Sequence, residues 1–249
     1  MINGKRVLAI IPARIGSVGI KEKNICLIHG KPLIGYTIEA AAGSRYLDRT
    51  IISTESEKIA EISRKLGGDV PFLRPEVLAT DTARSIDVML HAIEALRQEG
   101  DCYDVIVLLQ ATSPLRDEND IDNALEYFES VGEKSVLAVS KSERNPVLMR
   151  EKTPEGRLIP LIKAGSTVRR QDFKEYYIVN GAIYINLCEE LTGDTSLNDN
   201  LYGWEIPPSH ALDIDTPEDI DAVKKVLSLQ KQKKDAASKK ITNSTKVFL

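Results

Sequence analysis

The chain has 249 residues, of which 42% are apolar and 28% charged, and its formal net charge is −4. This composition fits one α/β domain with a sizeable core. The negative balance argues against a general affinity for nucleic acid or an anionic membrane, so an anionic ligand would have to be held by local cations and backbone amides. No stretch reaches membrane-spanning length, and the short apolar run near the start lacks a signal-peptide cleavage site.

The first half of the chain alternates short apolar runs with amphipathic segments. Residues 7–11 form a continuous apolar run, which is typical of a strand buried on both faces. The pattern then predicts a helix over 32–42 that Gly43 ends, a strand over 49–54, a helix over 56–66 and a short strand over 69–73. The three cysteines, Cys26, Cys102 and Cys188, are odd in number and widely spaced, which fits a reducing cytoplasm better than a disulfide framework.

The second half continues the alternation. Asp81 and Thr82 resemble a helix cap before the apolar stripe that starts at Ile86. Strands are expected over 105–109, 135–139 and 182–186, and helices over 119–130 and 217–229. This order predicts a doubly wound, mainly parallel sheet in one α/β domain over residues 1–229.

Two segments depart from the alternation. Residues 140–177 are polar, and a turn at 154–156 predicts a hairpin, so we expect a small inserted arm. Residues 230–249 hold six lysines and one aspartate. This tail is expected to be disordered or loosely helical.

The loop over residues 11–24 follows the first strand, at the sheet edge where doubly wound folds bind ligands. It holds two glycines, Arg14 and two lysines, which suit phosphate oxygens. It lacks the Gly-Lys-Ser/Thr ending of a P-loop and is no dinucleotide fingerprint. A solvated basic loop is the alternative interpretation, and the position after the strand disfavours it.

Several blocks together resemble the acylneuraminate cytidylyltransferases, the CMP-sialic acid synthetases. The first blocks are Ile-Pro-Ala-Arg-x-Gly-Ser and Lys-Asn within 11–24, Arg-Pro-x-x-Leu-Ala-x-Asp-x-Ala over 74–83, and Leu-Leu-Gln-x-Thr-Ser-Pro-Leu-Arg over 108–116. The later blocks are Arg-Arg-Gln-Asp over 169–172, Asn-Gly-Ala-Ile-Tyr over 180–184, and Asp-Ile-Asp-Thr-Pro-Glu-Asp over 213–219. The resemblance runs in order over roughly residues 5–227. It implies a nucleotidyltransferase that joins CMP from CTP to the anomeric hydroxyl of a nine-carbon acidic sugar, with release of pyrophosphate.

The resemblance also implies site residues. Those expected to bind the nucleotide are Pro12, Ala13, Arg14, Asn24, Arg74, Ala83, Ser85 and Gln110. Arg14 and Lys23 would offset charge on the triphosphate during catalysis. The residues expected to bind the sugar are Gln110, Arg170 and Tyr184. The arm resembles the family's dimerisation arm, so a homodimer is expected, and the sequence marks no side chain as a general base.

Asp213 and Asp215 flank Ile214. In an extended segment positions i and i+2 face the same side, and two carboxylates there suit Mg²⁺ together with triphosphate oxygens. A helix cap is an alternative for Asp215 alone, because a proline and a glutamate follow shortly after it. Asp213 has no such structural explanation.

A few positions depart from the family pattern. Val18 stands where a lysine is usual, and Lys21 is a candidate to supply that charge. Glu55 follows Ser-Thr where the family has aspartate, Ile178 stands where an arginine is frequent, and Leu148 stands where some members have lysine. Two alternatives therefore remain, a guanylyltransferase for a legionaminic-type sugar that uses GTP, and a homologue that binds nucleotide or sugar without catalysis.

Overall fold

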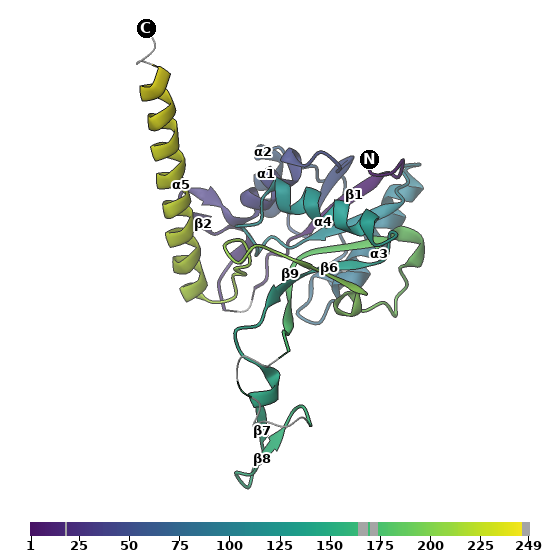
Figure 1. Cartoon of the computed structure of the whole chain (residues 1–249). Coiled ribbons are helices and arrows are strands. Elements are labelled where there is room, and N and C mark those ends of the chain that lie inside the picture. Colours follow the sequence, from purple (N-terminus) through teal and green to yellow (C-terminus); the bar gives the residue numbers. More distant parts are fainter. Residues whose placement is uncertain (18, 164–168, 170–173, 246–249) are drawn as a thin grey trace.

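The computed structural model describes residues 1–17, 19–163, 169 and 174–245, and for 233–245 the backbone alone. Its central sheet has the strand order β10-β6-β9-β5-β1-β4 (Figure 1). The strands are β1 (Val7–Pro12), β4 (Arg49–Ser53), β5 (Val105–Leu109), β6 (Val136–Lys141), β9 (Tyr177–Leu187) and β10 (Tyr202–Glu205). Every pairing in this sheet is parallel except the two that β9 makes with β5 and β6. The predicted doubly wound, mainly parallel sheet is confirmed.

Helices cover both faces of the sheet, because successive side chains along each strand point to opposite faces and both sets are apolar. Val7, Ala9 and Ile11 belong to one core cluster, whereas Leu8 and Ile10 belong to another. The first cluster includes residues of α1 (Leu33–Gly43), α2 (Glu57–Lys65) and α4 (Glu118–Ser130). The second includes α3 (Ser85–Gln98). The continuous apolar strands are thus buried on both sides.

Several predicted boundaries differ from the structure. The strand expected over 182–186 begins earlier, as β9 starts at Tyr177. The strand expected over 69–73 is reduced to isolated bridges at Asp69 and Leu73, because Pro71 between them has no N–H for a ladder. The cap expected at Asp81 is wrong, since α3 begins later, at Ser85. The helix expected to end at Leu229 continues as α5 (Pro217–Thr245), so the backbone of the tail is helical as far as Thr245.

The segment between β6 and β9 projects away from the sheet as a narrow arm (Figure 1). Its distal part is an antiparallel hairpin of β7 (Arg150–Lys152) and β8 (Leu158–Pro160). The turn lies where it was predicted, and Gly156 supplies its positive φ of 85°. A second short hairpin, β2 (Leu27–Ile28) with β3 (Lys31–Pro32), precedes α1.

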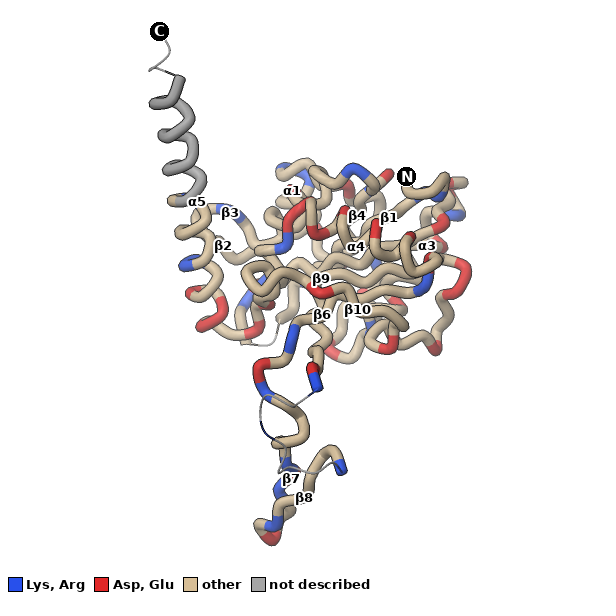
Figure 2. The backbone as a smooth tube through the Cα atoms, in the orientation of Figure 1, with Lys and Arg blue, Asp and Glu red and all other residues tan. Residues whose placement is uncertain are grey.

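Residues of both charge signs are interspersed over the domain and the arm (Figure 2). Among the described residues, no helix combines the length and the apolar character that a membrane span needs.

An ion network joins three segments at the amino-terminal edge of the sheet. Asp101 accepts hydrogen bonds from Tyr103 Oη at 2.6 Å and Arg49 Nη1 at 2.8 Å, and it pairs with Arg6 Nη2 at 2.8 Å. Arg6 and Arg49 directly adjoin or begin β1 and β4. These partners, the Tyr103 hydroxyl first, lower the pKa of Asp101 from 3.8 to about 2.

We expect Asp101→Asn to lower the free energy of unfolding at neutral pH by about 1–2 kcal/mol. The folded-state pKa lies below the unfolded one, so the stabilisation is present above pH 4 and is lost as the pH falls towards about 2. Urea unfolding of both proteins at pH 7 and at pH 2.5 checks this. A difference of the same size at the two pH values would contradict it.

Candidate active site

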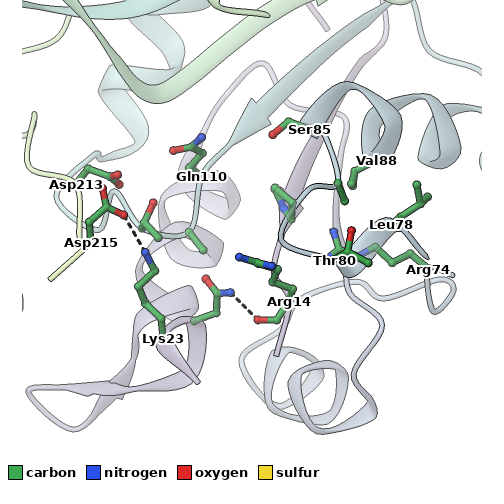
Figure 3. Close-up of a pocket in the computed structure, with 15 residues that line it drawn as sticks. Arg14, Lys23, Arg74, Leu78, Thr80, Ser85, Val88, Gln110, Asp213 and Asp215 are labelled. Atoms are coloured by element: carbon green, nitrogen blue, oxygen red, sulfur yellow. Dashed lines mark hydrogen bonds and ion pairs between the residues drawn. The ribbon is translucent and has the colours of Figure 1, made fainter. Parts of the chain in front are cut away.

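A pocket of about 380 Å³ opens at the carboxyl ends of β1 and β5 (Figure 3). From β1 the chain passes to β4 on one side and later returns to β5 on the other side. This reversal leaves a crevice at the end of the sheet, where α/β proteins bind ligands. The pocket is lined by Pro12, Arg14, Lys23, Asn24, Arg74, Leu78, Thr80, Ala83, Ser85, Val88, Gln110, Ala111, Thr112, Asp213 and Asp215.

The pocket gathers the predicted nucleotide, catalytic and metal positions with one exception. Ala13 does not line it, because its side chain is buried in the core and its N–H donates to the Ser53 carbonyl at 3.0 Å. Tyr184 lies in a neighbouring cavity. Arg170 and Val18 fall outside the described residues.

The loop after β1 brings two cations to the pocket. Asn24 Nδ2 donates to the Arg14 carbonyl at 2.9 Å, which ties the two ends of the loop together. The Arg14 guanidinium lies in the middle of the pocket (Figure 3). It pairs with Asp81, which does not line the pocket. Lys23 is only 14% exposed, whereas Lys21 is exposed and does not line the pocket. Lys21 therefore does not replace the family's missing lysine in this structure.

Lys23 reaches the segment that holds the two aspartates, on one side of the pocket (Figure 3). Its Nζ donates to the Ile214 carbonyl at 2.7 Å and to Asp215 Oδ1 at 3.0 Å. Arg74, with Leu78 and Thr80, lies on the opposite side (Figure 3). The pocket thus has Lys23 and the two aspartates at one end and Arg74 at the other.

Asp213 and Asp215 line the same pocket, as their spacing predicts, although the segment is extended chain rather than a strand. Ile214 between them is fully buried, and its N–H donates to the Thr112 carbonyl at 2.9 Å. Ser113 Oγ donates to Asp213 Oδ1 at 3.3 Å. The buried isoleucine directs both carboxylates to the opposite side, towards the pocket.

The alternative of a helix cap at Asp215 is not what the structure has. Thr216 Oγ1 accepts from the Asp219 N–H at 3.4 Å, and Asp219 Oδ2 accepts from the N–H groups of Asp215 and Thr216 at 3.0 and 2.7 Å. Thr216 and Asp219 therefore cap α5 between them. The Asp215 carboxylate stays 75% exposed beside Lys23.

Arg116 stands behind this site as a buried cation. Its side chain is fully enclosed, and Nη1 donates to the carbonyls of Gln110 at 3.2 Å and Ala182 at 2.9 Å. Burial lowers the pKa of Arg116 to about 10, against the opposing effects of Asp120 and Asp213. The guanidinium thereby joins the end of β5 to β9 and places positive charge near Asp213.

A second cavity of about 390 Å³ adjoins the first, and Ser85 and Gln110 line both. Tyr184 forms part of its wall, and its hydroxyl donates to Asn198 Oδ1 at 3.0 Å. Arg84 and the loop over residues 194–198 complete it. Gln110 thus stands between two adjoining spaces.

Gly181 leaves room for the Gln110 side chain. Its φ is +82°, and a Cβ there would lie 2.7 Å from Gln110 Oε1. We expect Gly181→Ala to displace Gln110 and to raise the KM for ligands of both cavities about tenfold. The added methyl group would clash with the Gln110 side chain, and alanine would be strained at the positive φ of this position. Steady-state kinetics of this variant check the prediction. Gly156→Ala in the arm has a positive φ without a clash, and it serves as the matched control.

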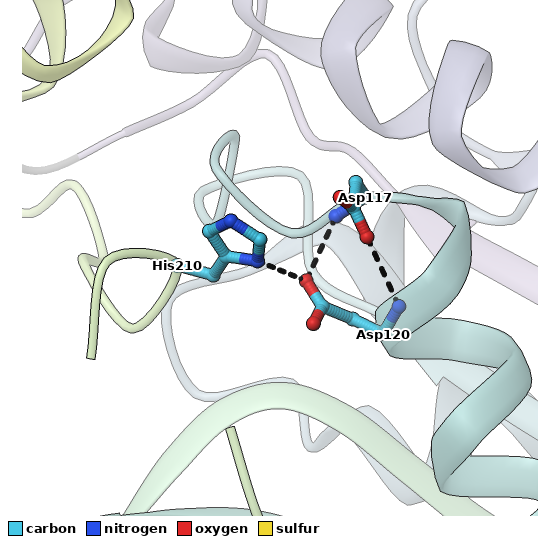
Figure 4. Close-up of side chains that lie close together, drawn as sticks. All are labelled: Asp117, Asp120 and His210. Carbon is cyan, nitrogen blue, oxygen red and sulfur yellow. Dashed lines mark hydrogen bonds and ion pairs between the residues drawn. The ribbon is translucent and has the colours of Figure 1, made fainter. Parts of the chain in front are cut away.

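Asp117, Asp120 and His210, none of which lines the pocket, form another group with metal-ligand chemistry (Figure 4). Asp117 and Asp120 each accept the other's backbone N–H, at 3.1 and 3.0 Å, and so form the capping box of α4. Asp120 Oδ2 also contacts His210 Nδ1 at 2.7 Å. Burial raises the pKa of Asp120, against these partners. These oxygens already have structural partners, so the group explains how α4 begins.

The family model for cytidylyltransferases matches residues 8–241. The chain belongs to the cytidylyltransferase family. Its match spans both cavities, the arm and most of α5, so every part of the site lies within the family's domain.

Two relatives illustrate the family. The N-acylneuraminate cytidylyltransferase of Streptococcus agalactiae serotype V is 36% identical over 215 residues, which are 85% of this chain and 51% of that protein. The CMP-N,N'-diacetyllegionaminic acid synthase of Legionella pneumophila is 34% identical over 239 residues, 91% of this chain and 98% of that protein. The chain therefore spans about half the length of the streptococcal relative and nearly the full length of the Legionella one.

A solved structure shares the fold. The CMP:2-keto-3-deoxy-manno-octonic acid synthetase complexed with CTP is similar with a TM-score of 0.67 and 15% identity, over 90% of this chain and 99% of that chain. At this identity the likeness shows the cytidylyltransferase fold alone.

Sequence reasoning assigned no role to two residues of this cytidylyltransferase site. Arg116 is the last residue of the block over 108–116, and its place within a block that resembles the family was the available signal. Glu55 was noted only as a departure from the family pattern. It follows β4, at the same edge of the sheet as the pocket, and that position could have singled it out.

Proposed function

We propose that the protein transfers CMP from CTP to the anomeric hydroxyl of a nine-carbon acidic sugar and releases pyrophosphate. The observation that carries this proposal is the meeting of Arg14 and Lys23 with Asp213 and Asp215 in one pocket at the carboxyl ends of β1 and β5. The names of the relatives support the substrate class, because they act on N-acylneuraminate and diacetyllegionaminic acid. A pseudaminic acid cytidylyltransferase of Campylobacter jejuni, 33% identical over 87% of this chain, adds a third sugar of that type.

We assign the nucleotide to the first cavity. The base would lie at the end with Arg74, Ala83 and Ser85, and the triphosphate would lie along Arg14 and Lys23. Arg14 can give a phosphate two parallel hydrogen bonds, and Lys23 acts as a compact point charge. The ion pair of Arg14 with Asp81 is exposed and weak, so a phosphate can displace it.

Mg²⁺ fits the donor set of the aspartate pair. The two carboxylates line the pocket, and Asp215 is 75% exposed beside Lys23, so together they present the hard oxygen ligands that this cation prefers. Asp213 and Asp215 would hold it, and when bound it would neutralise charge on the phosphates.

The second cavity is assigned to the sugar, with Gln110, Tyr184 and the loop over 194–198 as its walls. In the reaction the anomeric oxygen forms a bond to the α-phosphorus, the bond from that phosphorus to the bridging oxygen of pyrophosphate breaks, and the hydroxyl proton passes to water. Such a transfer depends on positioning and on charge neutralisation more than on covalent catalysis. Gln110, which lines both cavities, is placed to orient the two substrates.

Pyrophosphate release with each of the four nucleoside triphosphates, in the presence of Mg²⁺ and a panel of nonulosonic acids, tests the proposal. Release that requires CTP together with one such sugar is the expected result and names the sugar. Release with GTP alone would favour a guanylyltransferase. Binding of CTP without release for any sugar would favour a homologue that binds without catalysis.

We further propose that the arm makes the protein a homodimer. Four apolar side chains of the arm, Leu148, Leu158, Ile159 and Leu161, are between 48 and 65% exposed. Exposed apolar surface of this kind is typical of an interface. We expect Leu158→Ser with Ile159→Ser to convert a dimer into a monomer in sedimentation velocity. Leu201→Ser, at a position 72% exposed next to the edge strand β10, is the control. A wild-type monomer would contradict the proposal.

The cytoplasm is the proposed compartment. Its support is chemical, since Cys26, Cys102 and Cys188 are free thiols and the nucleotide is an intracellular substrate.

A further inference from the structure

We propose that Glu55 is a positioning residue that sets Arg74 and the phosphate loop relative to each other for nucleotide binding. The proposal rests on the function proposed above. Glu55 follows β4 and does not itself line the pocket. Its effect on the nucleotide would therefore pass through its two partners.

The Glu55 carboxylate joins two separate segments of the site. Oε1 accepts the Ile15 N–H at 2.7 Å, in the loop that carries Arg14. Oε2 accepts from Arg74 Nη2 at 3.1 Å. The backbone of Arg74 is held at the same place, since its N–H donates to the Thr54 carbonyl at 2.9 Å. One side chain thus fixes both the loop and the guanidinium.

The pair is buried, which makes it sensitive to loss of either charge. The side chains of Arg74 and Glu55 are 3% and 10% exposed. Burial lowers the pKa of Arg74, nearby Arg14 lowers it further, and Glu55 opposes both. Without the carboxylate, Arg74 would be a buried cation that Arg14 repels, and it would have to turn towards solvent.

The two hydrogen bonds also specify the chemistry of the side chain at position 55. Both partners donate, so the residue must supply two acceptors. A carboxylate has them, whereas a glutamine amide has one oxygen and one NH₂ group. Glutamine can therefore keep the bond to Ile15 or the bond to Arg74, and its NH₂ group faces a donor at the other. Aspartate also has two acceptor oxygens, but its side chain is one methylene shorter. We expect it to keep either the bond to Ile15 or the bond to Arg74 at full strength, and to weaken the other.

Arg74 also has an unused donor. Its Nε is buried and has no hydrogen-bond partner among the described residues. Because Arg74 lines the pocket, a nucleotide is the partner that the proposed function supplies for this guanidinium. Glu55 would hold one edge of the guanidinium and leave another edge for the ligand.

The test is equilibrium binding of CTP, measured by calorimetry, to the full-length wild-type protein and to Glu55→Gln, Glu55→Asp, Arg74→Met and the double variant Glu55→Gln/Arg74→Met. We expect Glu55→Gln to weaken CTP binding about tenfold or more and Glu55→Asp to weaken it less. The double variant should bind about as Arg74→Met does, because the glutamine oxygen is then free to accept the Ile15 N–H and no guanidinium remains for position 55 to hold. Glu57→Gln is the control, since Glu57 is 57% exposed and pairs with Arg64 on the surface of α2.

The amide proton of Ile15 gives a readout that needs neither binding nor activity. Its NMR signal should shift upfield and lose exchange protection in Glu55→Gln if the amide oxygen turns to Arg74. Should Glu55→Gln fail to fold, Glu55→Asp decides by the same two measurements. CTP affinity of Glu55→Asp equal to the wild type, with an unchanged Ile15 amide, would overturn the proposal.

Strictly additive effects of Glu55→Gln and Arg74→Met would also overturn it, because they would mean that Glu55 does not act through Arg74. A wild-type protein that binds no CTP would overturn the proposed function, and this inference with it. The two failures are distinguishable, because failure of the inference about Glu55 is seen only when the wild-type protein binds CTP, whereas failure of the proposed function is seen as a wild type that does not bind it.

Discussion

Replacement of both Asp213 and Asp215 by asparagine is expected to lower kcat/KM for CTP by roughly 10³-fold, which corresponds to the several kcal/mol that a bound divalent ion supplies in phosphoryl transfer. Asparagine keeps the size of the side chain and one oxygen but removes the negative charge. Because Asp215 is 75% exposed and caps nothing, its replacement should leave the fold intact. Steady-state pyrophosphate release over a range of Mg²⁺ concentrations measures the effect.

The single variants separate the two carboxylates. Asp213 accepts from Ser113 Oγ and lies near the buried Arg116, whereas Asp215 pairs with Lys23 at the surface. We expect both singles to need more Mg²⁺ for half-maximal rate. Asp221→Asn is the matched control, because Asp221 is 80% exposed on α5 and pairs with Lys224. An unchanged Mg²⁺ dependence of the double variant would exclude the pair as the metal site.

Lys23→Met is expected to lower kcat/KM for CTP about 10²-fold, since the variant loses a charge-assisted contact to a phosphate in a partly enclosed site. Methionine keeps most of the aliphatic length of the side chain, so its packing in the loop is largely preserved. The Lys23 ammonium now bonds the Ile214 carbonyl and Asp215. Its loss also leaves Asp215 without its counter-charge, so the metal dependence should change together with the rate.

Lys21→Met is the matched control for Lys23→Met. Lys21 lies in the same loop but is exposed and outside the pocket. We expect it to change kcat/KM less than twofold, as for most exposed charges. Equal losses in the two variants would mean that the loop acts through its overall charge and not through the position of Lys23.

Much of the fold follows from local patterns. The apolar runs at β1, β4 and β5 and the helix-stop glycines predict elements close to those observed. The arm and its hairpin turn were also predictable, because a polar segment with a Pro-Glu-Gly turn interrupts the α/β alternation. The errors occur where local signals compete. Pro71 prevents a full strand at 69–73, and Asp81, a residue type that favours caps, pairs with Arg14 instead.

Some features of the site could likewise be predicted from local patterns, and others could not. That Arg14 and Lys23 follow the first strand, and that Asp213 and Asp215 share one side, could be predicted because these are properties of single segments and their periodicity. Three contacts required the folded chain: Lys23 bonds Asp215, 192 positions away, Arg116 donates to the Gln110 carbonyl, and Glu55 joins Ile15 to Arg74. The reason is physical: these bonds exist because chain reversal in the sheet brings distant segments to one edge, and burial there makes each charge require a specific partner.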